Sequence, residues 1–194
     1  APHTEVGGAE AMAQILALDE GALAGSGLAT SARVAAFEAA LRDRLGEIAP
    51  LLDARAAAKK IRRCHGDLTL RNICLFEGEP TPFDAIEFDE RLATIDVLYD
   101  LAFLLMDLWH RDLRGHANLV FNRYLDAADE TDGLSTLPFF MAVRASIRAH
   151  VTATQAKAAS AEKASPLHTE AEAYFALAER LVTPRAHILV AVGG

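Results

Sequence analysis

Three short apolar runs in the middle of the sequence interrupt stretches that otherwise have the periodicity of helices. The runs cover residues 61–64, 73–76 and 82–88, and polar segments containing Gly or Pro separate them. Runs of this length with such boundaries predict β-strands, and residues 77–80 predict a hairpin turn. The sequence therefore predicts an α+β fold that is predominantly helical, with a small β-hairpin cluster embedded in the helices.

Helical periodicity covers most of what remains. The expected helices are 8–18, 31–45, a short one after Pro50, 96–110, 118–128, 138–159 and 166–181. We expect Ser31 and Ser165 to be N-caps, the second followed by Pro166 at the first helical position. Residues 21–30 are expected to connect the first two helices flexibly.

The composition is that of one folded domain. The chain has 194 residues, 52% of them hydrophobic, which suffices for one sizeable core that would include Trp109, Phe139 and Phe140. Its 19 Lys and Arg against 27 Asp and Glu give a formal net charge of -8. Nucleic-acid binding is therefore not expected, because it relies on positive charge.

Cysteine usage and hydrophobicity indicate the cellular setting. The two cysteines, Cys64 and Cys74, are too few for a disulfide framework, which favours a reduced, cytoplasmic location. Asp100 and Asp107 interrupt the most apolar stretch, residues 98–109. That stretch predicts a buried helix, and no membrane association is expected.

The most informative segment, residues 65–72, lies between two of the predicted strands. It reads His65-Gly66-Asp67-Leu68-Thr69-Leu70-Arg71-Asn72. Asp67 supplies a carboxylate that can accept a proton from a hydroxyl group, and Asn72 supplies an amide oxygen that can bind Mg²⁺. A loop held by strands at both ends is a common place for such groups. The spacing therefore predicts a phosphoryl-transfer loop.

Further acidic groups follow downstream. Asp84 and Glu87 lie at the end of an apolar run, where either is a candidate oxygen ligand for a cation that bridges phosphates. Asp100 opens the most hydrophobic predicted helix, in a position to accept hydrogen bonds from backbone N–H groups of a neighbouring loop.

In this order, the segments HGDLTLRNI, FDAIEF and YDLAFLL resemble the aminoglycoside phosphotransferase and choline kinase-like superfamily over residues 61–105. The resemblance implies the C-terminal catalytic lobe of a protein-kinase-like fold, with ATP and Mg²⁺ as cofactors. It implies Asp67 as the catalytic base and Asn72 and Asp84 as metal and cofactor ligands, with His65 and Asp100 supporting the loop. Glu87 stays an alternative to Asp84, although Asp84 is favoured because it ends the apolar run as the family's Asp does.

Other charged residues have two interpretations each. Thr69 stands where relatives often have His, which affects only a secondary contact. Arg71 is a candidate catalytic contact to a phosphate, or else a solvent-facing or carboxylate-paired arginine. Arg144 and Arg148, four residues apart, predict a solvated helix face, with recognition of an anionic substrate as the alternative. His110 and the other histidines after residue 100 lack metal-ligand spacing and are interpreted as surface or capping residues.

The expected domain organisation follows from what precedes the loop. Neither a GxGxxG segment nor a V-A-I-K-like strand occurs upstream, so we expect residues 1–183 to be the C-terminal lobe without the N-terminal ATP-clamping lobe. Residues 187–192 predict a strand, and 184–194 resemble the start of a truncated following domain or tail. The chain resembles bacterial proteins in which a kinase-like domain precedes a P-loop domain, a possible partner in the same parent chain.

Three functions are compatible with these residues. The first is an ATP- and Mg²⁺-dependent phosphotransferase that acts on a hydroxyl of a small molecule. The chain alone is expected to be inactive and to bind ATP weakly or not at all. The second is a non-catalytic binding or regulatory module that serves an adjacent P-loop domain. The third, a metal-dependent hydrolase using His65, Asp67 and Asp84, is disfavoured because two-metal sites have denser His and Asp clusters. In such phosphotransferases the acceptor is selected by helices and loops whose sequences follow no common code.

Overall fold

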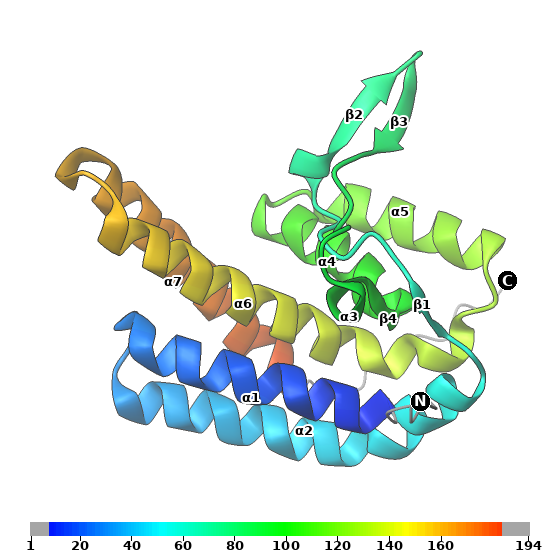
Figure 1. Cartoon of the computed structure of the whole chain (residues 1–194), viewed down its shortest axis with the longest axis horizontal. Coiled ribbons are helices and arrows are strands. Elements are labelled where there is room, and N and C mark those ends of the chain that lie inside the picture. The colour runs from blue at the N-terminus through cyan, green and yellow to red at the C-terminus, as the bar shows by residue number, and fades with distance from the viewer. Residues whose placement is uncertain (1–7, 184–194) are drawn as a thin grey trace, which may run out of the picture.

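The computed structural model describes residues 8–183, and most of them are helical (Figure 1). The long helices form two antiparallel pairs with a third pair beside them. They are α1 (Gly8–Ser26), α2 (Ser31–Ala57), α4 (Val97–His110), α5 (Arg114–Ala127), α6 (Leu137–Ala158) and α7 (Ala161–Val182). Helix α6 packs against α7, α4 and α1, so it lies at the centre of the helical body.

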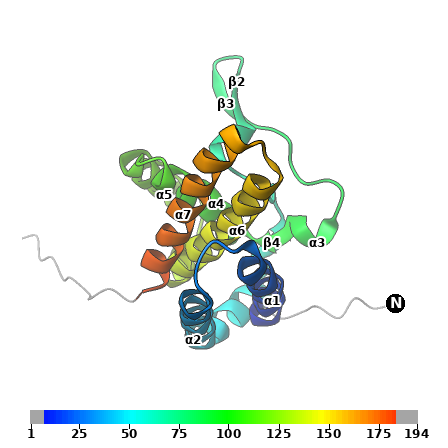
Figure 2. The same ribbon diagram turned by 90° about the vertical axis from the view of Figure 1, so that its left-hand side faces the viewer.

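Two small antiparallel sheets complete the fold. Strand β1 (Ile61–Arg63) pairs with β4 (Thr94–Asp96), and β2 (Ile73–Phe76) pairs with β3 (Glu79–Pro82). Short helical turns η1 (Leu70–Asn72), α3 (Glu90–Ala93) and η2 (Thr131–Thr136) connect the elements. The β2–β3 hairpin projects from the helical body in both views (Figures 1 and 2). The architecture confirms the prediction of a predominantly helical α+β fold.

The turn of the hairpin is shorter than predicted, and its second strand begins and ends earlier in the sequence. The second strand runs from Glu79 to Pro82, and residues 83–88, expected as a strand, are irregular. Glu77 and Gly78 form the turn with φ of 52° and 87°, the pair of positive values that a tight two-residue hairpin turn requires. Asp84 has φ of 60°, and a residue in this left-handed conformation cannot continue an extended strand.

Four helix boundaries and both expected N-caps, Ser31 and Ser165, were also predicted wrongly. Helix α1 continues through the expected flexible connection to Ser26, and α2 continues through Pro50 to Ala57 as one helix. Thr30, not Ser31, caps α2, where its hydroxyl accepts a hydrogen bond from the backbone nitrogen of Arg33. Helix α5 begins at Arg114, and α7 begins at Ala161 with Pro166 inside it. In each case packing between long helices extends them beyond the local signals.

Helix α4 is the most deeply buried element. All residues from Leu98 to Leu108 are buried, as expected for a helix in which Asp100 and Asp107 are the only charged residues of this stretch. Phe139 and Phe140 of α6 are inaccessible to solvent, as predicted, and the Phe140 ring lies 5.3 Å from the ring of Tyr99. Trp109, predicted to be in the core, is only half-buried at the end of α4. Among the described residues, no helix is long and apolar enough to cross a membrane.

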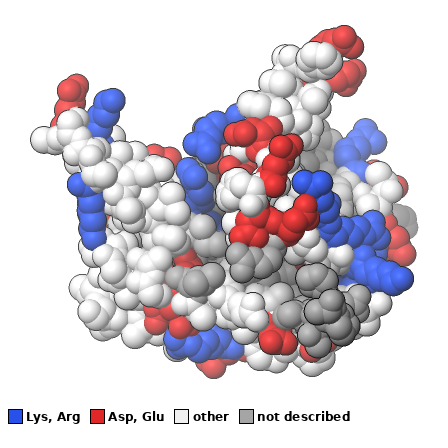
Figure 3. Space-filling model, viewed as in Figure 1, with Lys and Arg blue, Asp and Glu red and all other residues white. Residues whose placement is uncertain are grey.

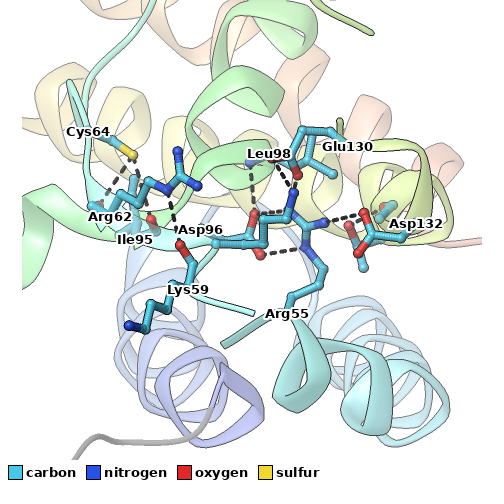
Figure 4. Close-up of polar contacts among 12 residues, drawn as sticks. Arg55, Lys59, Arg62, Cys64, Ile95, Asp96, Leu98, Glu130 and Asp132 are labelled. Atoms are coloured by element: carbon cyan, nitrogen blue, oxygen red, sulfur yellow. Dashed lines mark hydrogen bonds and ion pairs between the residues drawn. The ribbon is translucent and has the colours of Figure 1, made fainter. Parts of the chain in front are cut away.

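A buried arginine joins the helical body to the start of α4 (Figure 4). Arg55 of α2 has no exposed side-chain surface and makes two 2.8 Å hydrogen bonds to the carboxylate of Asp96. Its guanidinium also pairs with Glu130 at 2.8 Å and with Asp132 at 3.1 Å. Burial opposes the charge on Arg55, but the hydrogen bonds that its guanidinium donates to Asp96 and Glu130 outweigh it and raise the pKa of Arg55. The predicted strand 187–192 and the segment 184–194 lie outside the described residues.

Candidate active site

The loop after β1 is fixed to α4 through a buried carboxylate. Asp100 is 7% exposed, and its two oxygens accept hydrogen bonds from the backbone nitrogens of His65 at 3.1 Å and Gly66 at 2.9 Å. Gly66 has φ of 83°, and a Cβ there would lie 2.9 Å from the Cδ1 of Ile86. Only glycine fits this position, because it must be left-handed and closely packed.

A second carboxylate of α4 fixes the other end of the loop. Asp107 accepts a hydrogen bond of 3.0 Å from the backbone nitrogen of Leu70 and one of 3.1 Å from Nε of Arg111. Asp100 and Asp107 are seven residues apart, which places them on the same helix face. From the sequence, Asp107 was interpreted only as an interruption of the apolar stretch. Its seven-residue spacing from Asp100 could have indicated that it holds the loop as well.

Asp67 and Asn72 are joined directly. The Asn72 amide nitrogen donates hydrogen bonds of 2.9 Å to both the carbonyl oxygen and the carboxylate of Asp67. Asn72 is 3% exposed, whereas the Asp67 side chain keeps 30% of its surface accessible. Arg71 is largely exposed and lies 3.7 Å from the Asp67 carboxylate. Its position matches the carboxylate-paired interpretation.

The segment that carries Asp84 is tied to the same loop. The backbone nitrogen of Phe83 donates to the carbonyl of Asn72 at 3.0 Å, and that of Ile86 donates to the carbonyl of His65 at 2.9 Å. Nε2 of His65 lies 2.8 Å from the Phe83 carbonyl oxygen, and it must carry the proton because a carbonyl only accepts. His65 therefore positions residues 83–86 against the loop.

These segments line a cleft of about 670 Å³. Gly66, Asp67 and residues 84–88 form one side, and residues of α4 and α6 form the other. Asp67, Asp84 and Glu87 thus share the cleft, Asn72 lies behind Asp67, and Arg71 lines a smaller hollow beside it. On the face in Figure 3, acidic side chains gather below the hairpin with basic side chains on both sides.

The interpretation of Arg144 as part of a solvated face is wrong. Arg144 is 8% exposed and lines the cleft. Its guanidinium carbon lies 3.9 Å from the centre of the Tyr99 ring and 4.5 Å from that of Phe103. Arg148, one turn later, is half-buried, lines the same cleft and lies 5.6 Å from the Tyr174 ring. Both arginines are fixed by aromatic rings that come from distant parts of the chain.

The oxygen donors available to a cation are few. Within residues 8–183, no group of three or more His, Cys, Asp or Glu side chains is arranged to hold a metal ion. Asn72, Asp84 and Glu87 remain as the candidate donors in and behind the cleft. A cation held by two side chains would need further oxygens from its substrate, which is the usual situation for Mg²⁺ at phosphate sites.

Residues 9–137 match the family described as the phosphotransferase enzyme family. This stretch covers more than half of the chain and includes the loop, the segment of Asp84 and both carboxylates of α4. The chain belongs to the phosphotransferase enzyme family. The family match confirms the resemblance of the motifs. It ends at the first residue of α6, so the family assignment does not depend on Arg144 or Arg148.

Curated relatives of this phosphotransferase-family chain are uncharacterized proteins of Mycobacterium tuberculosis and Mycobacterium bovis. Each is 34% identical over 87 residues, which is 45% of this chain and 18% of the relative. The match therefore spans less than a fifth of the length of these relatives. No solved structure matches the chain.

Proposed function

We propose that this chain supplies the catalytic lobe of a kinase that transfers the γ-phosphoryl group of ATP to a hydroxyl of a small molecule. The observation that carries the proposal is the accessible carboxylate of Asp67, held by Asn72 at 2.9 Å in a cleft that Asp84 also lines. Membership of the phosphotransferase family supports the reaction class. The protein-kinase-like assignment of the lobe and the location of an ATP-clamping lobe elsewhere in the protein are part of the proposal.

Asp67 would act as the base. The hydroxyl oxygen of the acceptor forms a bond to the γ-phosphorus, the bond from that phosphorus to the β–γ bridging oxygen breaks, and ADP leaves. The hydroxyl proton passes to the Asp67 carboxylate. The hydrogen bond from Asn72 restricts the rotation of this carboxylate, so that its orientation does not have to be found during the reaction.

The residues present suit Mg²⁺. Both hydrogen bonds of the Asn72 side chain come from its amide nitrogen, which leaves the amide oxygen as the atom for a cation. Asp84 is exposed on the cleft and would supply a second oxygen, with Glu87 as the alternative. Mg²⁺ at such a site would neutralise negative charge on the transferred phosphoryl group.

The test is an assay of the full-length protein with Mg²⁺, ATP and a panel of small alcohols, sugars and hydroxy acids, followed by detection of phosphorylated product. The Asp67→Asn variant should lower turnover by about 10²–10⁴-fold, the typical contribution of a general base. Asp112→Asn is the matched control, because the Asp112 side chain is 94% exposed. Full turnover in Asp67→Asn would remove Asp67 from its role. A lack of transfer to every acceptor tried, together with unimpaired binding of a protein partner, would favour the non-catalytic module.

A further inference from the structure

The guanidinium of Arg144 has no anionic partner in the described part of the chain. It is 8% exposed, yet it makes no ion pair with any carboxylate of residues 8–183. Its Nη2 atom is buried without a hydrogen-bond partner, and its Nε donates only a long 3.4 Å bond to the Tyr99 carbonyl. A buried charge without a partner is strongly disfavoured, and a satisfied structure supplies it with an anion.

The aromatic contacts of Arg144 do not use its hydrogen-bond donors. The rings of Tyr99 and Phe103 lie against the guanidinium at 3.9 Å and 4.5 Å from its carbon. Contacts of this kind stabilise the positive charge through the ring face, whereas the N–H donors lie in the plane of the guanidinium. Arg144 is therefore held in place while its planar donor groups remain available for an oxygen anion.

A second guanidinium and an apolar surface adjoin it. Arg148 lies one turn further along α6 and lines the same cleft, as do Phe103, Ile147 and Val151. Within the described residues Arg148 makes no ion pair either. Two arginines beside an apolar patch suit a carboxylate attached to a short carbon chain, because the guanidinium fork matches the two carboxylate oxygens.

The charges of the cleft indicate which way such a molecule would lie. Asp67, Asp84 and Glu87 occupy the loop side, and Arg144 and Arg148 occupy the α6 side. A carboxylate would be repelled by the first group and attracted by the second. Its hydroxyl end would then face Asp67.

We propose that the α6 side of the cleft is the acceptor subsite and that the acceptor is a hydroxy acid, bound through its carboxylate by Arg144 and Arg148. The inference rests on the proposed function for the role of the hydroxyl group. The phosphates of ATP are the other source of anionic oxygens. They are assigned to the cation side at Asn72 and Asp84, and the experiment separates the two sources.

The first arm measures binding to the full-length protein without turnover. Glycerate and 4-hydroxybutyrate are compared with the uncharged glycerol and 1,4-butanediol by calorimetry and by thermal shift. We expect the acids to bind at least about tenfold more tightly than the alcohols, and Arg144→Gln and Arg148→Gln to remove the difference. Arg123→Gln is the control, because Arg123 is exposed on α5. Arg148→Gln and Arg144→Lys keep the test valid if Arg144→Gln does not fold.

The second arm measures turnover of the same variants with saturating ATP. We expect KM for the hydroxy acid to rise at least about tenfold, while KM for ATP stays within about twofold. Equal binding of acids and alcohols, or a rise in KM for ATP alone, would overturn the inference and leave the phosphotransferase proposal intact. Arginine-dependent binding of the acids with no phosphoryl transfer would support the acid-binding subsite and overturn the phosphotransferase proposal.

Discussion

The amide nitrogen of Asn72 bridges the backbone carbonyl and the side-chain carboxylate of Asp67 through two hydrogen bonds of 2.9 Å. The two residues are five positions apart, and η1 brings them together by turning the chain back on itself. One side chain thus fixes both the path of the loop and the direction of the carboxylate. A substitution at position 72 should affect both.

We expect Asn72→Ala to lower phosphoryl transfer by about 100-fold, because Asp67 loses its orienting donor and the candidate cation loses an oxygen ligand. The Mg²⁺ concentration required for half-maximal rate should also rise. Rates measured over a range of Mg²⁺ concentrations test both effects. Asn122→Ala, at an exposed position of α5, should leave them unchanged. An unaltered Mg²⁺ dependence in Asn72→Ala would mean that Asn72 is not a ligand.

Asp100 should be important for stability as well as for the site. Its carboxylate accepts hydrogen bonds from the backbone nitrogens of His65 and Gly66 at 3.1 Å and 2.9 Å. Asp100→Ala would leave these donors unpaired, and we expect the free energy of unfolding to fall by about 2–4 kcal/mol. Urea denaturation measures it. Asp112→Asn, at a 94% exposed side chain, should change it by less than about 0.5 kcal/mol, because asparagine tolerates the φ of 60° at this position. Similar values for the two variants would contradict the anchoring role.

Arg55→Met tests the buried ion cluster. The substitution keeps much of the side-chain volume but leaves Asp96, whose side chain is 10% exposed, without its cation. Glu130, 5% exposed, keeps only its ion pair with Lys60 at 3.0 Å. We expect a loss of about 3–5 kcal/mol in the free energy of unfolding. Arg33→Met removes the exposed pair with Glu179, at side-chain exposures of 43% and 31%, and should lose less than about 1 kcal/mol. Equal losses would show that the buried cluster contributes no more to the free energy of unfolding than an exposed ion pair does.

The stacking of His110 on Tyr174 predicts a pH dependence of stability. The ring centres are 3.6 Å apart, and burial lowers the pKa of His110 from its usual 6.5. Between the lowered pKa and 6.5 the unfolded chain binds more protons at this residue than the folded chain does. Its contribution to stability is therefore complete above pH 6.5 and is lost as the pH falls towards the folded pKa.

His110→Phe retains the stacked ring and removes the titration. Thermal unfolding of both proteins between about pH 5 and pH 8 should show a shallower loss of stability in the variant below about pH 6.5. Curves that remain parallel over this range would show that His110 titrates equally in the folded and unfolded chains. The structure alone reveals this residue, since the sequence indicated only a surface or capping histidine.

The family match confirms the motifs around the loop, and the sequence displays them because they are short and local. The spacing of Asp67 and Asn72, and an acid at the start of α4 able to receive backbone N–H groups, follow from short motifs. Strand β4 was missed because its three residues are too few to show alternation and run directly into α4. The environment of Arg144 was missed because Tyr99 precedes it by 45 residues. Their contact depends on how α4 and α6 cross, which neither segment encodes alone.

The β2–β3 hairpin has its base at the site and its tip in solvent. The pairing of Ile73 with Pro82 and the bond from Phe83 to Asn72 close its base, while Leu75 and Phe76 are exposed nearer the tip. Extra residues inserted between Glu77 and Gly78 would lengthen the arm without moving either end. That turn is accordingly a suitable position for a fluorescent label or an affinity peptide, because it lies at the far end of the hairpin from the cleft.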